Sequence, residues 1–422
     1  MKELRLGIAG LGTVAQGVLD IVSANREIIR SRSGVELRPV RVASRSPKSD
    51  IDLLGAEFST DLESLLAPDI DVLVELIGGE STAKDLITQA LDQGIPVVTA
   101  NKAVIARFGN ELLSGEQRTP LKFEAAVAGA IPIIQAIQHA LVANRFEQVI
   151  GIINGTCNYI LTAMQAQGKA FDDALAEAQR LGYAEADPSF DIDGVDAAHK
   201  LTILAGLAFD TKFDFEALYV EGISGVTSAD IAYADELGYR IKHVGIAKAS
   251  DLGVEARVHP VLMPKTTLLA NVDDVANAVV VKCDGAGQTL FSGPGAGGLA
   301  TASAVLGDVV RLATVTSNSE GDRPAKTGDY VPISDVICAN YIRIPVRDEP
   351  GVFAQIANAM SECGISIEAA IQKEPDMAGK VVDIVIVTHA VVESVMKKAL
   401  AVVEGLEAGE GTISRIRVEP LH

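Results

Sequence analysis

The stretch DIDGVDAAHKLTILAGLAF, residues 191–209, combines a lysine with carboxylates at a spacing that suits proton-transfer chemistry. Asp196 lies four residues before Lys200, and Asp191 and Asp193 lie just upstream. Residues four apart share one face of a helix, so the ammonium group and the carboxylate of such a pair can meet. A positioned lysine can serve as a proton donor in catalysis. The stretch is therefore the first candidate for a reaction centre.

Two interpretations of Lys200 follow from the residues alone. On a polar helix, the pair with Asp196 would be an ordinary surface ion pair worth about 0.3–0.5 kcal/mol. However, the segment LTILAGLAF that follows is apolar nearly all round, which favours a buried helix. A lysine at the start of such a helix either extends to water or is functional. Upstream, Glu185 and Asp187 add to an acidic cluster that suits the ammonium group of an amino acid.

The N-terminal segment GIAGLGTVAQG places Gly10, Gly12 and Ala15 in the pattern G-x-G-x-x-[GA] between a β-rich run and a helical pattern. The first glycine allows a tight turn, the second lets backbone amides approach a pyrophosphate, and the third position must be small for helix–sheet packing. The N-terminus of the following helix attracts negative charge. A plain glycine turn would show the same residues, but its place at the first strand–helix junction favours dinucleotide binding.

The end of the second expected strand carries no acidic residue, although an acid there would bind the ribose 2′-hydroxyl of NAD. The chain instead reads Ser44-Arg45-Ser46, with Lys48 close by. An arginine can pair with the 2′-phosphate of NADP, and a solvated surface arginine is the alternative. The sequence therefore predicts NADP as the preferred cofactor, with NAD as the second choice.

These candidate residues are positioned by strands that alternate with helices. Expected strands cover residues 4–9, 36–44, 69–79, 95–101 and 121–129, and expected helices cover 10–24, 83–94 and 131–145. This alternation predicts an α/β fold with a parallel sheet and helices on both faces. The first domain is thus expected to be a Rossmann-like NAD(P)-binding domain over residues 1–130, completed by residues near 300–315.

The middle of the chain is expected to form an α+β substrate-binding and dimerisation domain over residues 131–316. It contains an expected strand at 146–155 and helices at 157–167, 171–181 and 194–208, and it ends near the glycine-rich GPGAGG. The polar segment SNSEGDRPAKTGD, residues 317–329, is the best linker candidate.

After this linker, in the predicted domain at 330–422, the pattern changes to strand, helix, strand, strand, helix, strand, at residues 341–347, 351–364, 365–373, 380–389, 391–405 and 412–419. This order is that of a ferredoxin-like unit of about 80 residues. A lone four-stranded sheet leaves an edge open, which favours pairing between copies of the chain as a homodimer or homotetramer.

The bulk composition narrows the classes of function. The 422 residues exceed one ordinary core, which predicts two or three domains. The formal net charge of −20, without a basic run, argues against nucleic acid and membranes as partners. No apolar run reaches the roughly 18 residues of a membrane helix, and the start does not resemble a signal peptide. The four cysteines form no C-x-x-C pair, which predicts neither zinc nor disulfides and fits a cytoplasmic location.

Residues 178–200, AQRLGYAEADPSFDIDGVDAAHK, closely resemble the signature of homoserine dehydrogenases. Four further stretches resemble the family in the same order along the chain: GLGTVAQG, VVTANKA, GIINGTCNYIL and GPGAGGLATASAVLGD. The resemblance covers roughly residues 1–315, and the C-terminal unit resembles an ACT domain. It implies an enzyme that reduces L-aspartate 4-semialdehyde to L-homoserine with NAD(P)H, on the route to threonine, methionine and isoleucine.

The resemblance also implies roles for individual residues. Lys200 matches the catalytic proton donor to the carbonyl oxygen, and Lys102 of TANKA matches a second lysine at the nicotinamide and the substrate. The implied substrate-binding residues are Glu185, Asp191, Asp196, Asn154, Gly155 and Thr156. The implied cofactor-binding residues are Gly10, Gly12, Thr13, Val14, Arg45, Thr99, Ala100, Lys102 and Gly297, and the loop at 295–298 would close over the nicotinamide.

The stretch EAAVAGAIP resembles the monovalent-cation site of the family, although without the family an ordinary strand end would explain it. The implied ligands for Na⁺ or K⁺ are Glu124 and the carbonyl oxygens of Val127, Gly129 and Ile131. Two departures from the family pattern are visible. Ala15 replaces the third glycine, which is sterically tolerated, and GGESTA replaces the usual GG-x-x-PA, which affects only local loop shape.

The ACT-like unit implies regulation by an amino acid, and the resemblance suggests threonine as the effector. Asp348, Pro350 and Gly351 lie at the turn into its first helix, where backbone amides could meet a carboxylate. A dimerisation unit without a ligand is the alternative. Two further alternatives for the whole chain are an NAD(P) oxidoreductase of another amino acid and a catalytically dead amino-acid sensor. The intact set of Lys102, Glu185, Asp196 and Lys200 argues against the sensor.

Overall fold

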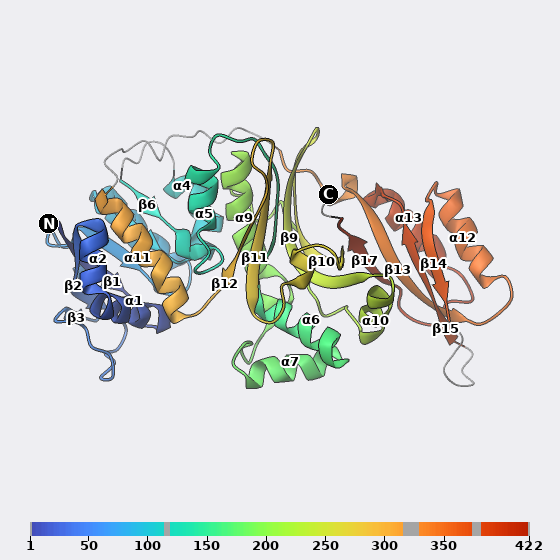
Figure 1. Cartoon of the computed structure of the whole chain (residues 1–422), viewed down its shortest axis with the longest axis horizontal. Coiled ribbons are helices and arrows are strands. Elements are labelled where there is room, and N and C mark those ends of the chain that lie inside the picture. The colour runs from blue at the N-terminus through green and yellow to red at the C-terminus, as the bar shows by residue number, and fades with distance from the viewer. Residues whose placement is uncertain (1, 114–118, 315–328, 374–380, 421–422) are drawn as a thin grey trace.

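The computed structural model describes residues 2–113, 119–314, 329–373 and 381–420. Figure 1 shows a first unit, a middle unit and a C-terminal unit that follow one another along the long axis of the molecule. The predicted α/β fold with a Rossmann-like domain, a mixed-sheet domain and a C-terminal ACT-like domain is confirmed. Among the described residues, no helix is both long and apolar enough to cross a membrane.

The first unit is a parallel sheet with the strand order β3-β2-β1-β4-β5-β6. This is the order of doubly wound dinucleotide-binding sheets, in which the ligand lies beyond the carboxyl ends of the strands where β1 and β4 diverge. The strands are β1 (Lys2–Ala9), β2 (Val35–Ala43), β3 (Glu57–Ser59), β4 (Val72–Glu75), β5 (Val97–Thr99) and β6 (Leu121–Lys122). The helices are α1 (Thr13–Ala24), α2 (Arg26–Ser33), η1 (Leu62–Leu66), α3 (Ser81–Asp92) and α4 (Lys102–Leu112).

A helix from much later in the chain, α11 (Gly298–Thr314), packs against α1 in the core of this first unit. The two backbones approach closely at Gly17, where a Cβ atom would lie 2.6 Å from the carbonyl oxygen of Gly298. Val305 and Val309 of α11 are fully buried there. The glycine-rich segment that begins α11 is therefore held beside the nucleotide loop.

Two predicted elements at the end of the first unit were wrong. The strand expected over 121–129 ends at Lys122 and is followed by a 3₁₀ turn, η2 (Glu124–Ala126). Ala128 and Gly129 both have a φ of 55°, a left-handed conformation that a strand does not adopt. The helix expected over 131–145 is reduced to α5 (Ile133–Gln135), two of whose amides donate to the Glu124 carboxylate, and a π-helical turn, η3 (Ala136–Ala140).

The middle unit is built on the strand order β12-β11-β7-β9-β10. Its strands are β7 (Phe146–Ile152), β8 (Tyr219–Val220), β9 (Tyr239–Ser250), β10 (Gly253–Pro264), β11 (Ala276–Cys283) and β12 (Gly287–Pro294). Its helices are α6 (Gly155–Gln167), α7 (Phe171–Arg180), α8 (Ser189–Ile192), α9 (Val195–Phe209), α10 (Ser228–Glu236) and η4 (Leu269–Asn271). The helices predicted at 157–167, 171–181 and 194–208 therefore lie within one or two residues of α6, α7 and α9.

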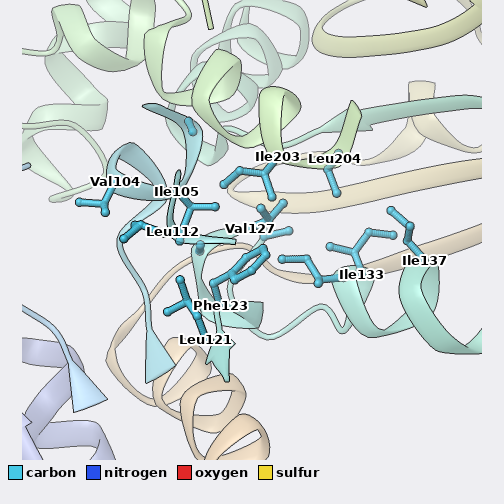
Figure 2. Close-up of a cluster of buried hydrophobic side chains, with 14 of the residues drawn as sticks. Val104, Ile105, Leu112, Leu121, Phe123, Val127, Ile133, Ile137, Ile203 and Leu204 are labelled. Atoms are coloured by element: carbon cyan, nitrogen blue, oxygen red, sulfur yellow. The ribbon is translucent and has the colours of Figure 1, made fainter. Parts of the chain in front are cut away.

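One apolar core joins the first and middle units and fixes the position of α9. Figure 2 shows Val104 and Ile105 of α4 close to Ile203 and Leu204 of α9, with Val127 between them. Burial of each such side chain is worth about 1.5–3 kcal/mol, more than an exposed ion pair contributes. Packing therefore holds the two helices that carry Lys102 and Lys200 together.

The C-terminal unit has the strand order β17-β13-β15-β14, which is the order of a ferredoxin-like sheet. Its elements are η5 (Ile333–Asp335), β13 (Ile337–Arg347), α12 (Val352–Glu362), β14 (Ile367–Gln372), β15 (Val381–Thr388), β16 (Val391–Val392), α13 (Glu393–Glu404) and β17 (Ser414–Val418). Helices α12 and α13 cover one face, and the other face packs toward α10 of the middle unit. The predicted linker at 317–329 lies almost entirely outside the described residues.

The expectation that this sheet stands alone was wrong. Strand β17 pairs in parallel with β10, with Val261 opposite Arg417 and Leu262 opposite Val418, so the two sheets form one continuous sheet. The amide of Glu419 extends this pairing by donating to the carbonyl oxygen of Leu262. Edge strands carry unpaired backbone groups, and here β10 satisfies those of β17. The free edge that remains in the C-terminal unit is β14.

Candidate active site

Asn154 brings the two carboxylates of the predicted substrate site together. Its side-chain oxygen accepts the amide of Cys157 and caps α6, as expected of an asparagine at a helix start. Its amide nitrogen donates to Asp191 Oδ1 at 2.7 Å and to Asp196 Oδ2 at 2.8 Å. The hydroxyl of Thr156 donates to the carbonyl oxygen of Tyr183 at 2.7 Å and lies 3.2 Å from the second oxygen of Asp191. The start of α6 therefore orients both acidic side chains.

Asp196 receives both predicted lysines. Lys102 Nζ lies 2.5 Å from Asp196 Oδ1, and Lys200 Nζ lies 2.7 Å from Asp196 Oδ2. The Lys200 ammonium also donates to the carbonyl oxygen of Ile153 at 2.7 Å. Lys200 is 8% exposed and Asp196 is 3% exposed, so the pair is no surface ion pair and Lys200 does not extend to water. The start of α9 thus forms a site in which two ammonium groups surround one buried carboxylate.

Burial and charge set the pKa values of these groups. Burial lowers the pKa of Lys200, with Lys102 adding to the effect, and Asp196 only partly opposes it. Burial alone would raise the pKa of Asp196, but the attraction of Lys200 and Lys102 outweighs it and the pKa is lowered. Burial also raises the pKa of Asp191. Asp196 thus stays ionised while Lys200 is inclined to release a proton.

Lys102 reaches this site from the first turn of α4. The preceding Asn101 caps that helix by accepting the amide of Val104, and its amide nitrogen donates to the carbonyl oxygen of Gly79 at 2.7 Å. The ammonium of Lys102 also lies 5.5 Å from the ring centroid of Phe190, within cation–π range. Lys102 therefore approaches Asp196 from the nucleotide-binding unit, opposite to Lys200.

Glu185 lies apart from this network. It is exposed, and its backbone carbonyl accepts the side-chain amide of Gln179 at 3.0 Å. Among the described residues, no hydrogen bond or ion pair links the Glu185 carboxylate to Asp191 or Asp196. Gly155, in contrast, lies within the site, because its backbone begins α6 directly after Asn154.

The predicted nucleotide loop has the geometry that a pyrophosphate requires. Gly10 has a φ of 99°, and a Cβ atom there would lie 2.7 Å from the carbonyl oxygen of Leu76. Gly12 is exposed, and a Cβ atom there would point into open space, which leaves room for a ligand against the backbone. Ala15 is fully buried, as the small third position should be. Thr13 and Val14 form the first turn of α1, whose amides face the same space.

The other cofactor candidates lie along the same edge of the sheet. Arg45 is exposed, shortly after the end of β2. Thr99 ends β5, and its hydroxyl donates to the buried carboxylate of Glu75 at the end of β4. Ala100 follows, and its amide donates to the carbonyl oxygen of Glu75. Gly297 is exposed with a φ of 118°, in the turn before α11.

Some residues of this region were missed by the sequence analysis. Glu75 is fully buried, and burial raises its pKa to about 7. His199 is also buried, lies between the rings of Phe190 and Phe215, and has its pKa lowered to about 4 by burial and by Arg107. A glutamate at the end of the apolar run VLVE was a visible signal, whereas nothing local marked His199.

The proposed cation ligands form a tight turn. The two oxygens of the Glu124 carboxylate accept the amides of Ile134 and Gln135. Val127 and Gly129 are buried residues, and the carbonyl oxygen of Ile131 accepts the amide of Ile133. Hard oxygen atoms of this kind suit a monovalent cation, so the residues fit such an ion. No cluster of three or more His, Cys, Asp or Glu side chains offers a metal site in the described ranges.

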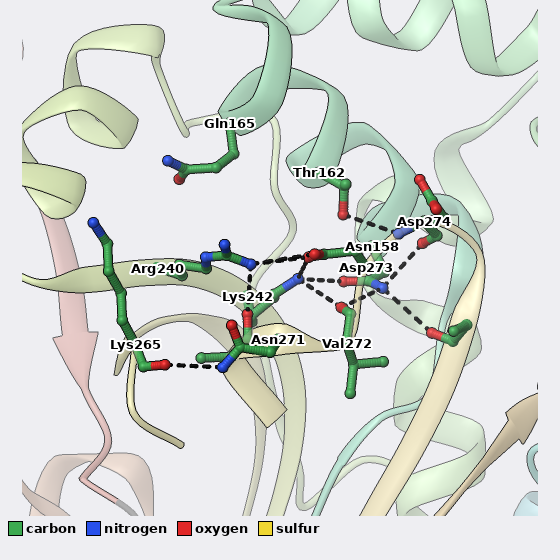
Figure 3. A network of polar contacts seen from close by, with 12 residues as sticks. Asn158, Thr162, Gln165, Arg240, Lys242, Lys265, Asn271, Val272, Asp273 and Asp274 are labelled. Atoms are coloured by element: carbon green, nitrogen blue, oxygen red, sulfur yellow. Dashed lines mark hydrogen bonds and ion pairs between the residues drawn. The ribbon is translucent and has the colours of Figure 1, made fainter. Parts of the chain in front are cut away.

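A polar network fixes the loop that packs on the start of α6. Figure 3 shows the Lys242 ammonium between Asn158 and Asp273, at 3.2 and 2.9 Å. The Asn158 amide donates to the carbonyl oxygens of Val272 and Asp274, both at 3.0 Å. Because this loop lies against the backbone of residue 155, the network supports the substrate turn from behind.

Comparisons with known proteins agree on one family. The family models for homoserine dehydrogenase and for its NAD-binding domain match residues 132–310 and 10–124, and the ACT domain model matches residues 340–405. A homoserine dehydrogenase of Pseudomonas aeruginosa is 46% identical over 434 residues, with all of both chains covered. The crystal structure of a homoserine dehydrogenase from Thiobacillus denitrificans has a TM-score of 0.94 at 45% identity and covers 100% of this chain and 99% of that chain. A hyperthermophilic archaeal homoserine dehydrogenase in complex with NADPH has a TM-score of 0.62 at 29% identity, covering 73% of this chain and 97% of that chain.

Proposed function

The chain belongs to the homoserine dehydrogenase family of oxidoreductases, and on that premise we propose that it reduces L-aspartate 4-semialdehyde to L-homoserine with NADPH as the preferred reductant. The product would supply the route to threonine, methionine and isoleucine. The observation that carries the proposal is the meeting of Lys102 and Lys200 at the single buried carboxylate of Asp196.

Lys200 is the proposed proton donor. When bound, the dihydronicotinamide supplies a hydride to the aldehyde carbon, and negative charge then develops on the carbonyl oxygen. Among the described residues, Lys200 Nζ donates two of its N–H groups to the Ile153 carbonyl oxygen and the Asp196 carboxylate, and the third can donate to that carbonyl oxygen of the substrate. Its lowered pKa favours proton release in the transition state. In the reverse direction the neutral amine would accept the hydroxyl proton of homoserine.

Lys102 and the carboxylates have complementary roles in this proposal. Lys102, whose ammonium pairs with the buried Asp196, places a second positive charge beside the developing oxyanion. Asp196 holds both ammonium groups in place, and Asp191 binds the amino group of the substrate with help from the turn at Asn154 and Thr156. Glu185, which is exposed, would bind the substrate together with Asp191.

NADP is proposed as the cofactor because the residues at the carboxyl edge of the first sheet fit it. The open space at Gly12 accepts a pyrophosphate against backbone amides, and Arg45 offers a positive charge where NAD-specific proteins carry an acid. The relative solved with NADPH supports a nicotinamide dinucleotide of this kind. Glu124 with the carbonyl oxygens of Val127, Gly129 and Ile131 would hold a Na⁺ or K⁺ ion that stiffens the turn beside the substrate site.

The ACT domain is proposed to regulate the enzyme through threonine, with homodimers or homotetramers as the working assembly. The turn from β13 into α12 ends at Gly351, which has a φ of 93° and directly precedes the helix. The amides that follow would bind the threonine carboxylate. The free edge of β14 is the surface through which two copies would pair.

Initial rates test the proposed reaction directly. Purified protein with aspartate semialdehyde should oxidise NADPH, and oxidise NADH more slowly at equal concentration. Homoserine with NADP should give the reverse reaction, whereas aspartate with NADP should give none. Turnover of aspartate in place of homoserine would assign the chain to another amino-acid oxidoreductase and contradict the proposal.

A further inference from the structure

A short segment at residues 219–223 lies between the C-terminal unit and the substrate site. Its first part, β8, pairs in parallel with β10, with Val220 opposite Val258. The amide of Glu221 continues this pairing by donating to the carbonyl oxygen of Val258 at 2.8 Å. The segment is thus anchored to the same strand that accepts β17 of the C-terminal unit.

One side of this segment supports the turn that carries Asp191. The amide of Ile223 donates to the carbonyl oxygen of Ile192 at 2.9 Å. Gly222 packs so closely that a Cβ atom would lie 2.7 Å from the Cα atom of Asp193. His243 also lies between the two parts, because its Nε2 atom lies 3.0 Å from the Glu221 carbonyl oxygen and a Cβ atom at Gly194, just before α9, would lie 3.3 Å from its ring. Movement of residues 221–223 would therefore displace the turn at 191–194.

The other side of the segment is held by an arginine of the C-terminal unit. Arg417 Nη1 lies 2.9 Å from Glu221 Oε2, and the hydroxyl of Tyr219 donates to the same oxygen at 2.7 Å. The guanidinium also stacks on the Tyr219 ring at 4.7 Å. Within its own unit, Arg417 pairs with Glu393, whose side chain is fully buried and also binds Arg415. Arg417 is thus oriented by the C-terminal unit before it reaches Glu221.

We propose that Glu221 and Arg417 are positioning residues for the substrate site. The ion pair between them fixes residues 221–223, those residues fix the turn at 191–194, and that turn sets the place of Asp191 beside Asn154. The C-terminal unit is then part of the support of the amino-acid site rather than an appended module. The expected effect on kinetics rests on the proposed function, because it is measured with homoserine as the substrate. The expected effect on the position of residues 191–194 does not.

A second ion pair between the same two units provides a matched control. Arg343 of β13 pairs with Asp230 of α10 at 2.8 Å, and both side chains are nearly or fully buried. This pair also joins the C-terminal unit to the middle unit, but among the described residues α10 makes no backbone hydrogen bond to the turn at 191–194. Loss of either ion pair should weaken the junction between the two units. Only loss of the Glu221–Arg417 pair should also displace Asp191.

The kinetic test compares Glu221→Gln with Asp230→Asn in the full chain. Glu221 is 36% exposed as a side chain, so E221Q should fold, which its thermal midpoint would show. We expect E221Q to raise KM for homoserine about 5- to 20-fold while KM for NADP stays within about twofold, because displacement of a binding group weakens substrate binding selectively. D230N should leave both KM values within about twofold even if it lowers the thermal midpoint. An equal rise of both KM values in E221Q, or an equal effect of D230N, would overturn the proposal.

Hydrogen–deuterium exchange provides a readout that does not depend on activity. E221Q should speed exchange of the amides at 191–194 and at Ile223, and D230N should leave them as in the wild type. Arg417→Lys, which keeps the charge but loses the forked geometry, should resemble E221Q, and the double variant should add nothing further. Unchanged exchange at 191–194 in E221Q would refute the positioning role. Inactivity of the wild type on homoserine with this exchange pattern present would refute the proposed function alone.

Discussion

At Lys200, burial and charge act on the same proton from opposite directions. Burial and the neighbouring Lys102 lower the pKa of the ammonium group, and Asp196 raises it, with burial the larger effect. The sequence alone could establish the i,i+4 spacing of Asp196 and Lys200, and the apolar segment that follows indicated burial. It could not show Lys102 on the same carboxylate, because that contact joins helices from two units. The combination makes Lys200 a better acid than a solvated lysine.

Lys200→Met is the first residue-scale prediction. The thioether keeps a stem of similar length but has no proton to donate, so kcat should fall about 10²–10⁴-fold while NADPH binding is nearly kept. Lys242→Met is the matched control, since Lys242 is also buried and paired with a carboxylate but lies in the network of Figure 3. Its kcat should change less than about tenfold. Steady-state rates and nucleotide titration by fluorescence measure both; near-wild-type kcat in folded K200M would remove the assigned role.

Arg45→Ala addresses the choice of cofactor. If the exposed guanidinium after β2 binds the 2′-phosphate, its loss should weaken NADPH about 10-fold or more and leave NADH nearly unchanged. Arg38→Ala is the control. Arg38 is also an exposed arginine, but it lies in the first half of β2 and pairs with Glu3. Dissociation constants for both nucleotides decide the matter. Equal weakening of the two would show that Arg45 does not distinguish them.

At the scale of elements, local patterns predicted what local interactions determine. The apolar run after Lys200 placed α9 within a residue of its observed bounds, and the strand–turn–helix at Gly10 followed its glycine pattern. The segment at 121–145 was mispredicted because hydrogen bonds between residues ten and eleven positions apart shape it. There the Glu124 carboxylate captures two amides from beyond the turn, and Ala128 adopts a left-handed conformation that its side chain does not favour.

The buried histidines of α9 and β9 predict a dependence of stability on pH. Burial lowers the pKa of His243, and likewise of His199, to about 4, below the ordinary value of about 6.5. Between these values the unfolded chain binds protons that the folded chain does not. The two histidines should therefore not reduce the free energy of unfolding above about pH 6.5. Below that pH, the free energy of unfolding should decrease as the pH falls toward about 4.

Urea unfolding of His243→Gln tests this directly. Glutamine does not titrate and can still donate to the Glu221 carbonyl oxygen, so the midpoint should drop less between about pH 7 and about pH 5 than in the wild type. The exposed His389 provides the control for the loss of a histidine at the surface, and H389Q should retain the wild-type drop. An identical drop in H243Q and the wild type would contradict the assignment.

At the scale of the whole molecule, the pairing of β10 with β17 makes the ACT domain continuous with the catalytic sheet. The repeated β-α-β pattern predicted the ferredoxin-like unit itself, since each of its elements has its own periodicity. The junction left no such pattern, because it consists of two residue pairs between strands far apart in the chain. One consequence is that deletion of the ACT domain would expose the edge of β10 and remove Arg417 from Glu221. Regulation is therefore better tested by point variants in the full chain than by truncation.

Threonine should inhibit the full-length enzyme from the turn that precedes α12. Asp348 lies in that turn and receives a hydrogen bond from Gln372 of β14, which ties the turn to the free edge of the unit. Inhibition from such a site requires threonine to bind a less active state more tightly, so it should lower kcat or raise KM without competing with homoserine, by up to about 10-fold. Asp348→Ala should weaken this inhibition, whereas the neighbouring exposed Glu349→Ala should not. Initial rates at several homoserine concentrations separate the outcomes. Purely competitive inhibition that D348A leaves unchanged would place threonine in the substrate site, and no inhibition of the wild type would contradict a regulatory role of threonine.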